Sequence, residues 1–285
     1  MGHRPRRTSR NNNTTQRLAA IIVTLAIAIV TGSAGSFGGC AQLTQLLPEA
    51  LTQRLSNAAS VSSLGDIPAY SGNPIVYINA SETHPQGAPT FTSEEISRAQ
   101  SGTFTEFSRL DYLDRCGAAL ACLGQETLPT KPRESISHVY PSGWDQRSYD
   151  IIDEGVLYNR CHLIAFSLCG ENDNERNLIT GTRAMNVDGM KPLEEQTARY
   201  IEHTHNHVLY RVTPLFEEGQ LVAHGVHMEA YSLEDDGDGL SFNVYCYNNQ
   251  PGVAIDYTTG ASRAWCSHAS SPAARSPRAS TLRGS

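Results

Sequence analysis

The sequence has little positive charge beyond its first residues. It holds 22 Lys and Arg against 29 Asp and Glu, and five of the arginines lie within residues 1–17, which contain no acid. The remainder has 17 basic and 29 acidic residues, which excludes the broadly basic surface that many nucleic-acid binders use. Residues 131–211 hold nine of the basic residues against twelve acids, so this segment is the most permissive place for a polyanion.

The sequence also lacks any CxxC pair and any internal repeat. The absence of CxxC argues against a zinc site built from cysteines. Seven cysteines are present, and setting Cys40 aside leaves six, which suits three disulfides in an oxidising compartment. Nearest-neighbour pairing predicts the bridges Cys116–Cys122, Cys161–Cys169 and Cys246–Cys266.

The long apolar run of the sequence lies next to the basic N-terminus. Residues 18–30 contain a single polar residue and lead into a Gly- and Ser-rich stretch that ends at Cys40. This order is typical of an export signal, and the alternative is a transmembrane anchor over residues 18–37. Residues 37–40 (FGGC) are similar to a bacterial lipobox, although Phe37 replaces the usual Leu. We expect an extracellular protein, secreted or lipid-anchored at Cys40, with no other membrane contact.

Composition and patterning predict four segments. They are a signal peptide over residues 1–39, a flexible spacer over 40–65, a globular domain over 66–266 and a disordered tail over 267–285. Within the domain, Thr92 and Glu95 form a capping-box pattern that opens a helix, and Pro192 begins a helix of about three turns. Residues 105–125 have a mixed pattern that predicts neither a helix nor a strand. Strands are predicted at 74–79, 137–140, 149–158, 178–180, 207–216, 221–233 and 241–248, and one carries His162. The outline is an α+β fold around an antiparallel sheet.

Three polar residues follow one another on a predicted strand–loop–helix unit. His162 lies on the strand, Asn186 follows 24 residues later, and Glu194 lies eight further on. Phosphodiester hydrolysis needs a base for water, a cation on the phosphoryl oxygens and positive charge for the pentacoordinate state. Imidazole suits the base and an amide oxygen suits Mg²⁺, whose waters Glu194 can orient. Arg160 and Arg183 can pair with phosphate. Taken alone, each residue has a commoner structural role.

The sequence motifs around these residues resemble those of a known family. Residues 159–163 (NRCHL), 177–186 (NLITGTRAMN) and 189–201 (GMKPLEEQTARYI) are similar to the motifs (D/N)RGH, NL-TGTR---N and GM--FE--VA-Y. These motifs are typical of the DNA/RNA non-specific endonucleases of the ββα-metal (His-Me finger) class, especially the secreted DNases and DNA-entry nucleases of Gram-positive bacteria. The resemblance covers about residues 66–260, with the motifs in order.

The resemblance implies a ββα-metal nuclease fold and an exported endonuclease that cuts DNA, and RNA as well, with little sequence preference. It implies that His162 activates water, that Asn186 binds the metal directly, and that Glu194 holds metal-bound waters. The implied metal is Mg²⁺, with Mn²⁺ as the alternative, and the implied products carry 5′-phosphate ends. The predicted phosphate contacts are Arg160, Arg183 and Arg199.

Some alternatives stay open at this point. Cys161 stands where the family has Gly, so its side chain either crowds the strand or forms a bridge to Cys169 that pins the next loop, which we favour. Glu195 is adjacent to Glu194 and is the alternative acid. Two other functions compete with a free endonuclease: a surface nucleic-acid-binding protein without catalysis, and an antibacterial nuclease toxin. The intact histidine, asparagine and glutamate favour an enzyme over a binder.

Overall fold

The computed structural model describes residues 61–265. The predicted signal peptide, most of the spacer, the tail, Cys40 and Cys266 lie outside the described residues. Within them, Val61 and Leu64 already pack against a buried cluster that contains Tyr245, so the folded chain includes the end of the predicted spacer. No helix of this part of the chain is long and apolar enough to cross a bilayer.

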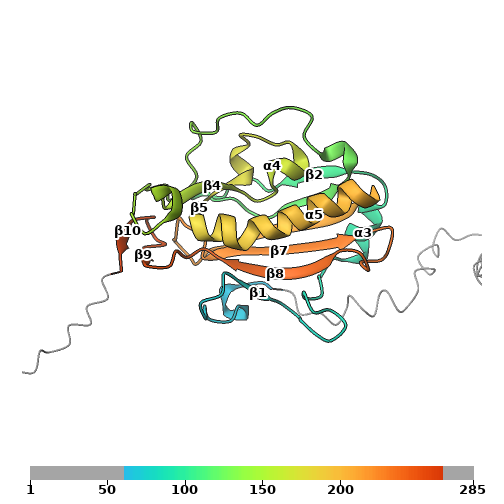
Figure 1. Cartoon of the computed structure of the whole chain (residues 1–285), viewed down its shortest axis with the longest axis horizontal. Helices are drawn as coiled ribbons and strands as arrows, with labels where there is room; N and C mark the ends of the chain where they lie inside the picture. Colours follow the sequence, from blue (N-terminus) through green and yellow to red (C-terminus); the bar gives the residue numbers. More distant parts are fainter. Residues whose placement is uncertain (1–60, 266–285) are drawn as a thin grey trace, which may run out of the picture. The chain divides into compact units, whose positions relative to one another are not determined.

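A six-stranded antiparallel sheet forms the centre of the fold (Figure 1). Its strand order is β1-β8-β7-β6-β3-β2. The strands are β1 (Ile75–Tyr77), β2 (Phe104–Phe107), β3 (Ala119–Leu123), β6 (Val208–Leu215), β7 (Gly225–Ser232) and β8 (Ser241–Tyr247). Prediction located β1, β6, β7 and β8 but missed β2 and β3. Almost every residue of β3 is buried, so it lacks the apolar–polar alternation that marks a half-exposed strand.

Smaller elements surround this sheet. Two further antiparallel pairs are β4 (Tyr158–His162) with β5 (Leu178–Thr182), and β9 (Val253–Ile255) with β10 (Ser262–Ala264). The α-helices are α3 (Ser93–Ala99), α4 (Phe166–Cys169) and α5 (Lys191–Thr204), and a π-helix, η5 (Met185–Met190), leads into α5. Short 3-10 turns are η1 (Leu64–Asp66), η2 (Gln125–Thr127), η3 (Asp153–Gly155) and η4 (Glu175–Asn177).

The sheet has helices on both faces. Figure 1 shows α5 lying along the sheet, with β4, β5 and α4 beside it. Leu193 and Ile201 of α5 are buried in one cluster with Tyr210 of β6, whereas the neighbouring Leu209 packs with Ile96 of α3. Because side chains alternate along a strand, α5 and α3 cover opposite faces. The predicted α+β architecture around an antiparallel sheet is confirmed.

The two predicted helix starts are also confirmed. Thr92 Oγ1 accepts a hydrogen bond from the Glu95 N–H at 3.2 Å, and the Glu95 carboxylate accepts one from the Thr92 N–H at 2.8 Å. This reciprocal pair begins α3. Pro192 lies in the first turn of α5, which runs for 14 residues and is longer than predicted.

Two predicted strands are absent. Residues 137–140 are irregular, because the Arg160 side chain donates to the carbonyl oxygens of Ser137 and Val139. Residues 149–157 fold into a turn that contains η3, with Glu154 in the left-handed region at φ 63°, and Tyr158 begins β4. Both segments have a composition that favours strands, but hydrogen bonds and turns set by the tertiary structure give them another conformation.

The predicted disulfides within the described residues are not formed. The five cysteines between residues 61 and 265 are unbonded. The Cys116 thiol donates to the Leu178 carbonyl at 3.2 Å, while the Cys122 thiol donates to the Ala99 carbonyl at 3.4 Å. These two thiols belong to different buried clusters, so proximity in sequence does not make them partners.

The surroundings of Cys161 show whether its side chain crowds the strand or forms a bridge to Cys169. Cys161 is fully buried, and a Cβ added to Gly181 on β5 would lie 2.3 Å from its Sγ. The thiol therefore fills space that Gly181 leaves free, and it does not crowd the turn or bond to Cys169. Burial raises the pKa of the Cys161 thiol far above its ordinary value, so the thiol stays protonated and unreactive.

Candidate active site

A ββα unit, made of β4, β5 and the η5–α5 helical segment, carries the predicted residues. Asn177 fixes the end of β4, where His162 lies: its buried side chain accepts from the Ile164 N–H at 2.9 Å and donates to the Ile164 carbonyl at 3.0 Å. Asn248 ties β5 to the main sheet by donating to a β5 carbonyl and to the Ala223 carbonyl, at 3.0 and 2.8 Å. Buried amides thus hold the unit rigidly on the scaffold.

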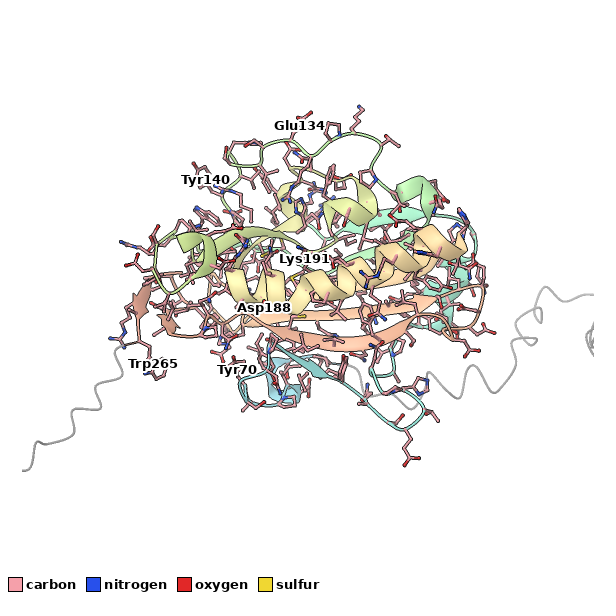
Figure 2. The ribbon with its side chains drawn as sticks, in the orientation of Figure 1. Tyr70, Glu134, Tyr140, Asp188, Lys191 and Trp265 are labelled. Carbon is pink, nitrogen blue, oxygen red and sulfur yellow. The ribbon has the colours of Figure 1, made fainter. Side chains whose placement is uncertain are left out.

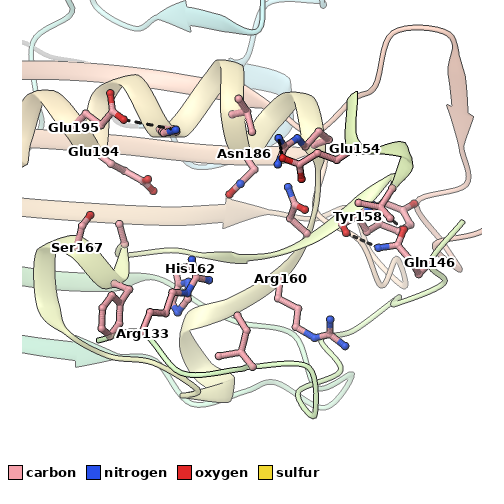
Figure 3. A pocket seen from close by; sticks show the side chains of 18 of the residues that line it. Arg133, Gln146, Glu154, Tyr158, Arg160, His162, Ser167, Asn186, Glu194 and Glu195 are labelled. Atoms are coloured by element: carbon pink, nitrogen blue, oxygen red, sulfur yellow. Dashed lines mark hydrogen bonds and ion pairs between the residues drawn. The ribbon is translucent and has the colours of Figure 1, made fainter. Parts of the chain in front are cut away.

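A cavity of about 830 Å³ opens beside this unit (Figure 3). His162, Asn186 and Glu194 all line it, so the structure brings together the three residues that are dispersed in sequence. Figure 3 shows Asn186 and Glu194 on the helical segment, across the cavity from the strand that carries His162. Four cationic side chains line it as well: Arg133, Arg160, Arg183 and Lys191.

His162 is arranged as a proton acceptor. Its side chain is almost fully buried, with 7 % of the residue exposed, and its Nε2 lies 2.8 Å from the Asn172 carbonyl oxygen. Burial lowers the pKa of His162, and the positive charge of Arg133 lowers it further, against the opposing hydrogen bond to Asn172. The ring is therefore neutral, Nε2 carries the proton that it donates to Asn172, and Nδ1 keeps its lone pair.

Asn186 lies in the π-helix η5, where the Lys191 N–H donates to its backbone carbonyl five residues earlier. Such wide turns are frequent at functional sites. The side-chain amide of Asn186 makes no hydrogen bond with any residue between 61 and 265. Its oxygen is therefore free to bind a cation.

Glu194 lies in the first turn of α5 and is only partly exposed. It has no hydrogen bond or ion pair within the described chain, and burial raises its pKa to about 8, with Arg133 opposing the shift. The neighbouring Glu195 is exposed and lies 3.8 Å from both Lys191 and Arg199. A buried carboxyl without a partner is costly, so the structure favours Glu194 over Glu195 as the group that waits for a cation.

The residues present fit a hydrated divalent ion. No group of three or more His, Cys, Asp or Glu side chains in residues 61–265 is arranged to hold a metal. A site made of the Asn186 amide oxygen and the Glu194 carboxylate suits an ion that keeps most of its waters, as Mg²⁺ does, and does not suit a tightly caged ion.

Arg133 is a site residue that the sequence analysis missed. It lies in the irregular segment before β4, and Figure 3 shows it beside His162. Its guanidinium has no hydrogen bond or ion pair with a described residue, yet its charge acts on both His162 and Glu194. The next residue, Glu134, donates its N–H to the Asn172 side chain at 3.1 Å. The available signal was the higher share of basic residues in 131–211 than in the flanking parts of the domain, although acids still outnumber them there.

The three predicted phosphate contacts have different surroundings. Arg160 donates to two backbone carbonyls, and Arg183 pairs with Glu154 at 2.7 Å. Both line the cavity. Arg199 is exposed on α5, is not among the residues that line the cavity, and lies near Glu195. Their roles in phosphate binding stay predictions.

Comparison with known proteins now identifies the domain. Residues 95–233 match the model of the DNA/RNA non-specific endonuclease family. The chain carries a DNA/RNA non-specific endonuclease domain. The resemblance seen in the sequence motifs is thereby confirmed, and the endonuclease domain makes this chain a nuclease, a hydrolase with nucleic acid as substrate. No curated protein matches the sequence.

Solved structures share the fold of the endonuclease domain. NucA from Streptococcus agalactiae with magnesium ion bound has a TM-score of 0.59 and 22 % identity, over 76 % of this chain and 98 % of NucA. The form of NucA with no metal bound gives a TM-score of 0.56 and 24 % identity, over 76 % and 97 %. Sda1 nuclease with bound zinc ion gives 0.50 and 27 %, over 55 % and 79 %. The predicted ββα-metal nuclease fold is confirmed.

Proposed function

We propose that the endonuclease domain hydrolyses phosphodiester bonds of DNA, and of RNA, with little sequence preference and with a divalent metal ion. The observation that carries the proposal is the convergence of a neutral, buried imidazole with an amide and a carboxyl that lack protein partners, all lining one cavity. Groups left without partners in a cavity are those that a ligand completes.

Asn186 would hold the metal directly, and Glu194 would hold it through water. Bound there, Mg²⁺ would polarise the phosphoryl oxygens and neutralise charge on the leaving oxygen. Mn²⁺ is the alternative. Structures of NucA with magnesium ion and of Sda1 with zinc ion support a metal in this fold.

The chain's own residues supply the proton transfer and the positive charge. His162 Nδ1 takes a proton from the attacking water, while Nε2 stays hydrogen-bonded to Asn172, which fixes the tautomer and stabilises the imidazolium that forms. Arg133, free of acidic partners, pairs with the phosphate as negative charge builds up on its oxygens. Glu194, once ionised, is the carboxylate that holds the metal through water.

A matched pair of glutamates tests the site. Plasmid cleavage by the purified protein should stop with EDTA and return with Mg²⁺. Glu194→Gln should raise the Mg²⁺ concentration for half-maximal cleavage about tenfold or more, since groups that hold a metal through water typically tune its affinity by that factor. Glu195→Gln should leave it within about twofold. Equal effects of the two substitutions, or cleavage that persists in EDTA, would rule out the assigned site. RNA digestion under the same conditions tests the second substrate.

We also propose that the protein is exported and that residues 1–39 are its signal. The sequence pattern before Cys40 supports this, and it lies outside the described residues. Palmitate labelling of the wild type and of Cys40→Ala in the producing cell decides whether a lipid anchors it. Label in the wild type alone supports the anchor, whereas an unlabelled wild type leaves secretion without a lipid.

A further inference from the structure

Away from the proposed base, the cavity is bordered by a ladder of stacked side chains. Its inner rung is Tyr158, which is buried and donates its hydroxyl to the Gly260 carbonyl at 2.9 Å. Trp144 packs against it with ring centroids 6.3 Å apart. The Arg160 guanidinium lies 4.2 Å from the Trp144 ring centroid and 5.3 Å from that of Tyr140. The ladder therefore runs from the core to the surface.

Arg160 is fixed within this ladder. Its Nε donates to the Val139 carbonyl, and its Nη2 donates to the Ser137 carbonyl at 2.8 Å. No carboxylate of residues 61–265 pairs with it. The same side chain thus stacks on the rings and anchors the segment that carries Tyr140, which makes the outer ring a preorganised surface.

Tyr140 ends the ladder with an open ring. It is 71 % exposed, and Figure 2 shows it at the outer edge of the fold. Large aromatic side chains are normally buried to a greater extent. A planar ring held on the Arg160 cation, with solvent over the rest of it, offers a stacking position that nothing in the described chain fills.

The strand β4 links this platform to the proposed chemistry. Arg160 and His162 are two residues apart on β4, so they lie on the same face about 6–7 Å apart along the strand. Both line the same cavity. A nucleic-acid strand whose phosphate lies at His162 therefore passes the ladder within a short distance.

We infer that Tyr140 is a stacking platform for an unpaired nucleobase of the substrate, and that Arg160 positions this platform. The inference rests on the proposed nuclease function. Bases of an intact duplex already stack on one another, so only a single-stranded or displaced base reaches the ring. Aromatic stacking accepts every base because each has a π-face, so the platform favours unpaired strands without adding sequence specificity.

Binding to an uncut oligonucleotide tests the platform. The full chain with His162→Ala is titrated by fluorescence anisotropy, with Mg²⁺, against a short single strand, a strand of the same length with abasic residues, and a blunt duplex. Tyr140→Ala should weaken binding of the normal single strand about tenfold, and leave the abasic strand and the duplex within about twofold. Tyr140→Phe should keep the affinity, because it keeps the ring. Tyr112→Ala, at a tyrosine that is 81 % exposed and whose ring does not stack on Arg160, is the matched control.

The outcomes separate this inference from the proposed function. Unchanged single-strand binding by Tyr140→Ala, or an equal loss with the abasic strand, overturns the platform. A loss in Tyr140→Phe equal to that in Tyr140→Ala does the same, since it assigns the effect to the hydroxyl. In the chain with His162 intact, Tyr140→Ala should raise KM on single strands by the same factor with kcat within about twofold. If the wild-type protein cuts no nucleic acid at all, the proposed function fails while the binding result still stands.

Discussion

The two faces of the six-stranded sheet differ in whether their buried charged groups have partners. On the face that α3 covers, the buried Glu229 carboxylate accepts from Arg211 Nε at 2.8 Å and from the backbone and hydroxyl of Thr90 at 2.7 and 2.8 Å. Arg211 also donates to Glu95 at 2.8 Å. Every charge in this network has a partner, and the network joins α3 and the segment before it to β6 and β7.

On the α5 face, several polar groups that line the cavity lack a hydrogen-bond or ion-pair partner among the described residues. Glu194 and the Asn186 amide have no partner in the described chain, Arg133 is free, and His162 keeps one acceptor nitrogen. The Glu229 network is complete, whereas the side chains of Glu194, Asn186 and Arg133 have no partner in residues 61–265. The comparison teaches that a completed network stabilises the fold, whereas an incomplete one awaits a ligand. Changes on the first face should therefore reduce stability, and changes on the second should reduce activity.

The strongest test of this division is His162→Ala. Loss of a general base should lower kcat/KM on plasmid DNA by about 10²–10⁴-fold, while the melting temperature in EDTA stays close to that of the wild type. His203→Ala, at an exposed histidine near the end of α5, should cut normally. Wild-type cleavage by His162→Ala would refute the assigned base.

The next largest effect is expected on the opposite face. Arg211→Met leaves the Glu229 carboxylate buried without its cation, which should cost about 3–5 kcal/mol in the free energy of unfolding. Urea denaturation measures it, and the folded fraction should keep its kcat. Adding Glu229→Gln to Arg211→Met should recover part of the loss, since no unpaired charge remains. A fully active and fully stable Arg211→Met would break the comparison.

Arg133 tests the contribution of a free positive charge on the active face. Arg133→Ala should lower kcat/KM about 100-fold, the usual loss for one group that stabilises transition-state charge, and Arg133→Lys should restore only part because an ammonium does not bind phosphate bidentately. Lys131→Ala provides the matched control, since Lys131 is exposed and does not line the cavity. Equal losses at both positions would indicate a general charge effect on substrate binding.

The last test is a pH dependence of stability in EDTA. The folded-state pKa of Glu194, about 8, lies above its ordinary value of 4.5, so the folded state binds this proton more tightly. The stability contribution is fully present below pH 4.5 and is lost as the pH rises to about 8. Glu194→Gln should therefore gain stability relative to the wild type over that range, as measured by urea unfolding. A constant difference between the two proteins across the range would contradict the raised pKa.

The sequence was sufficient where function is encoded in contiguous motifs. His162, Asn186 and Glu194 were selected by the motifs around them, and the structure places all three at one cavity, while their catalytic roles stay predictions. The central strands β6 to β8 were found because they are long and bounded by turn residues.

Prediction failed where distant partners decide the structure. The strand predicted at 137–140 is irregular because the Arg160 side chain donates hydrogen bonds to its carbonyl oxygens. The backbone next to Arg133 is held by a hydrogen bond from the Glu134 N–H to the side chain of Asn172, 38 positions away. The two predicted disulfide pairs that lie within the described residues failed for a related reason. Spacing in sequence does not reveal that Cys116 and Cys122 belong to different buried clusters.

Asn172 has a consequence that extends beyond either of its contacts. Its carbonyl holds the His162 ring, and its side chain holds the backbone next to Arg133. One residue thus ties the position of the proton acceptor to the segment that carries the arginine beside it, so a substitution at Asn172 would disturb both.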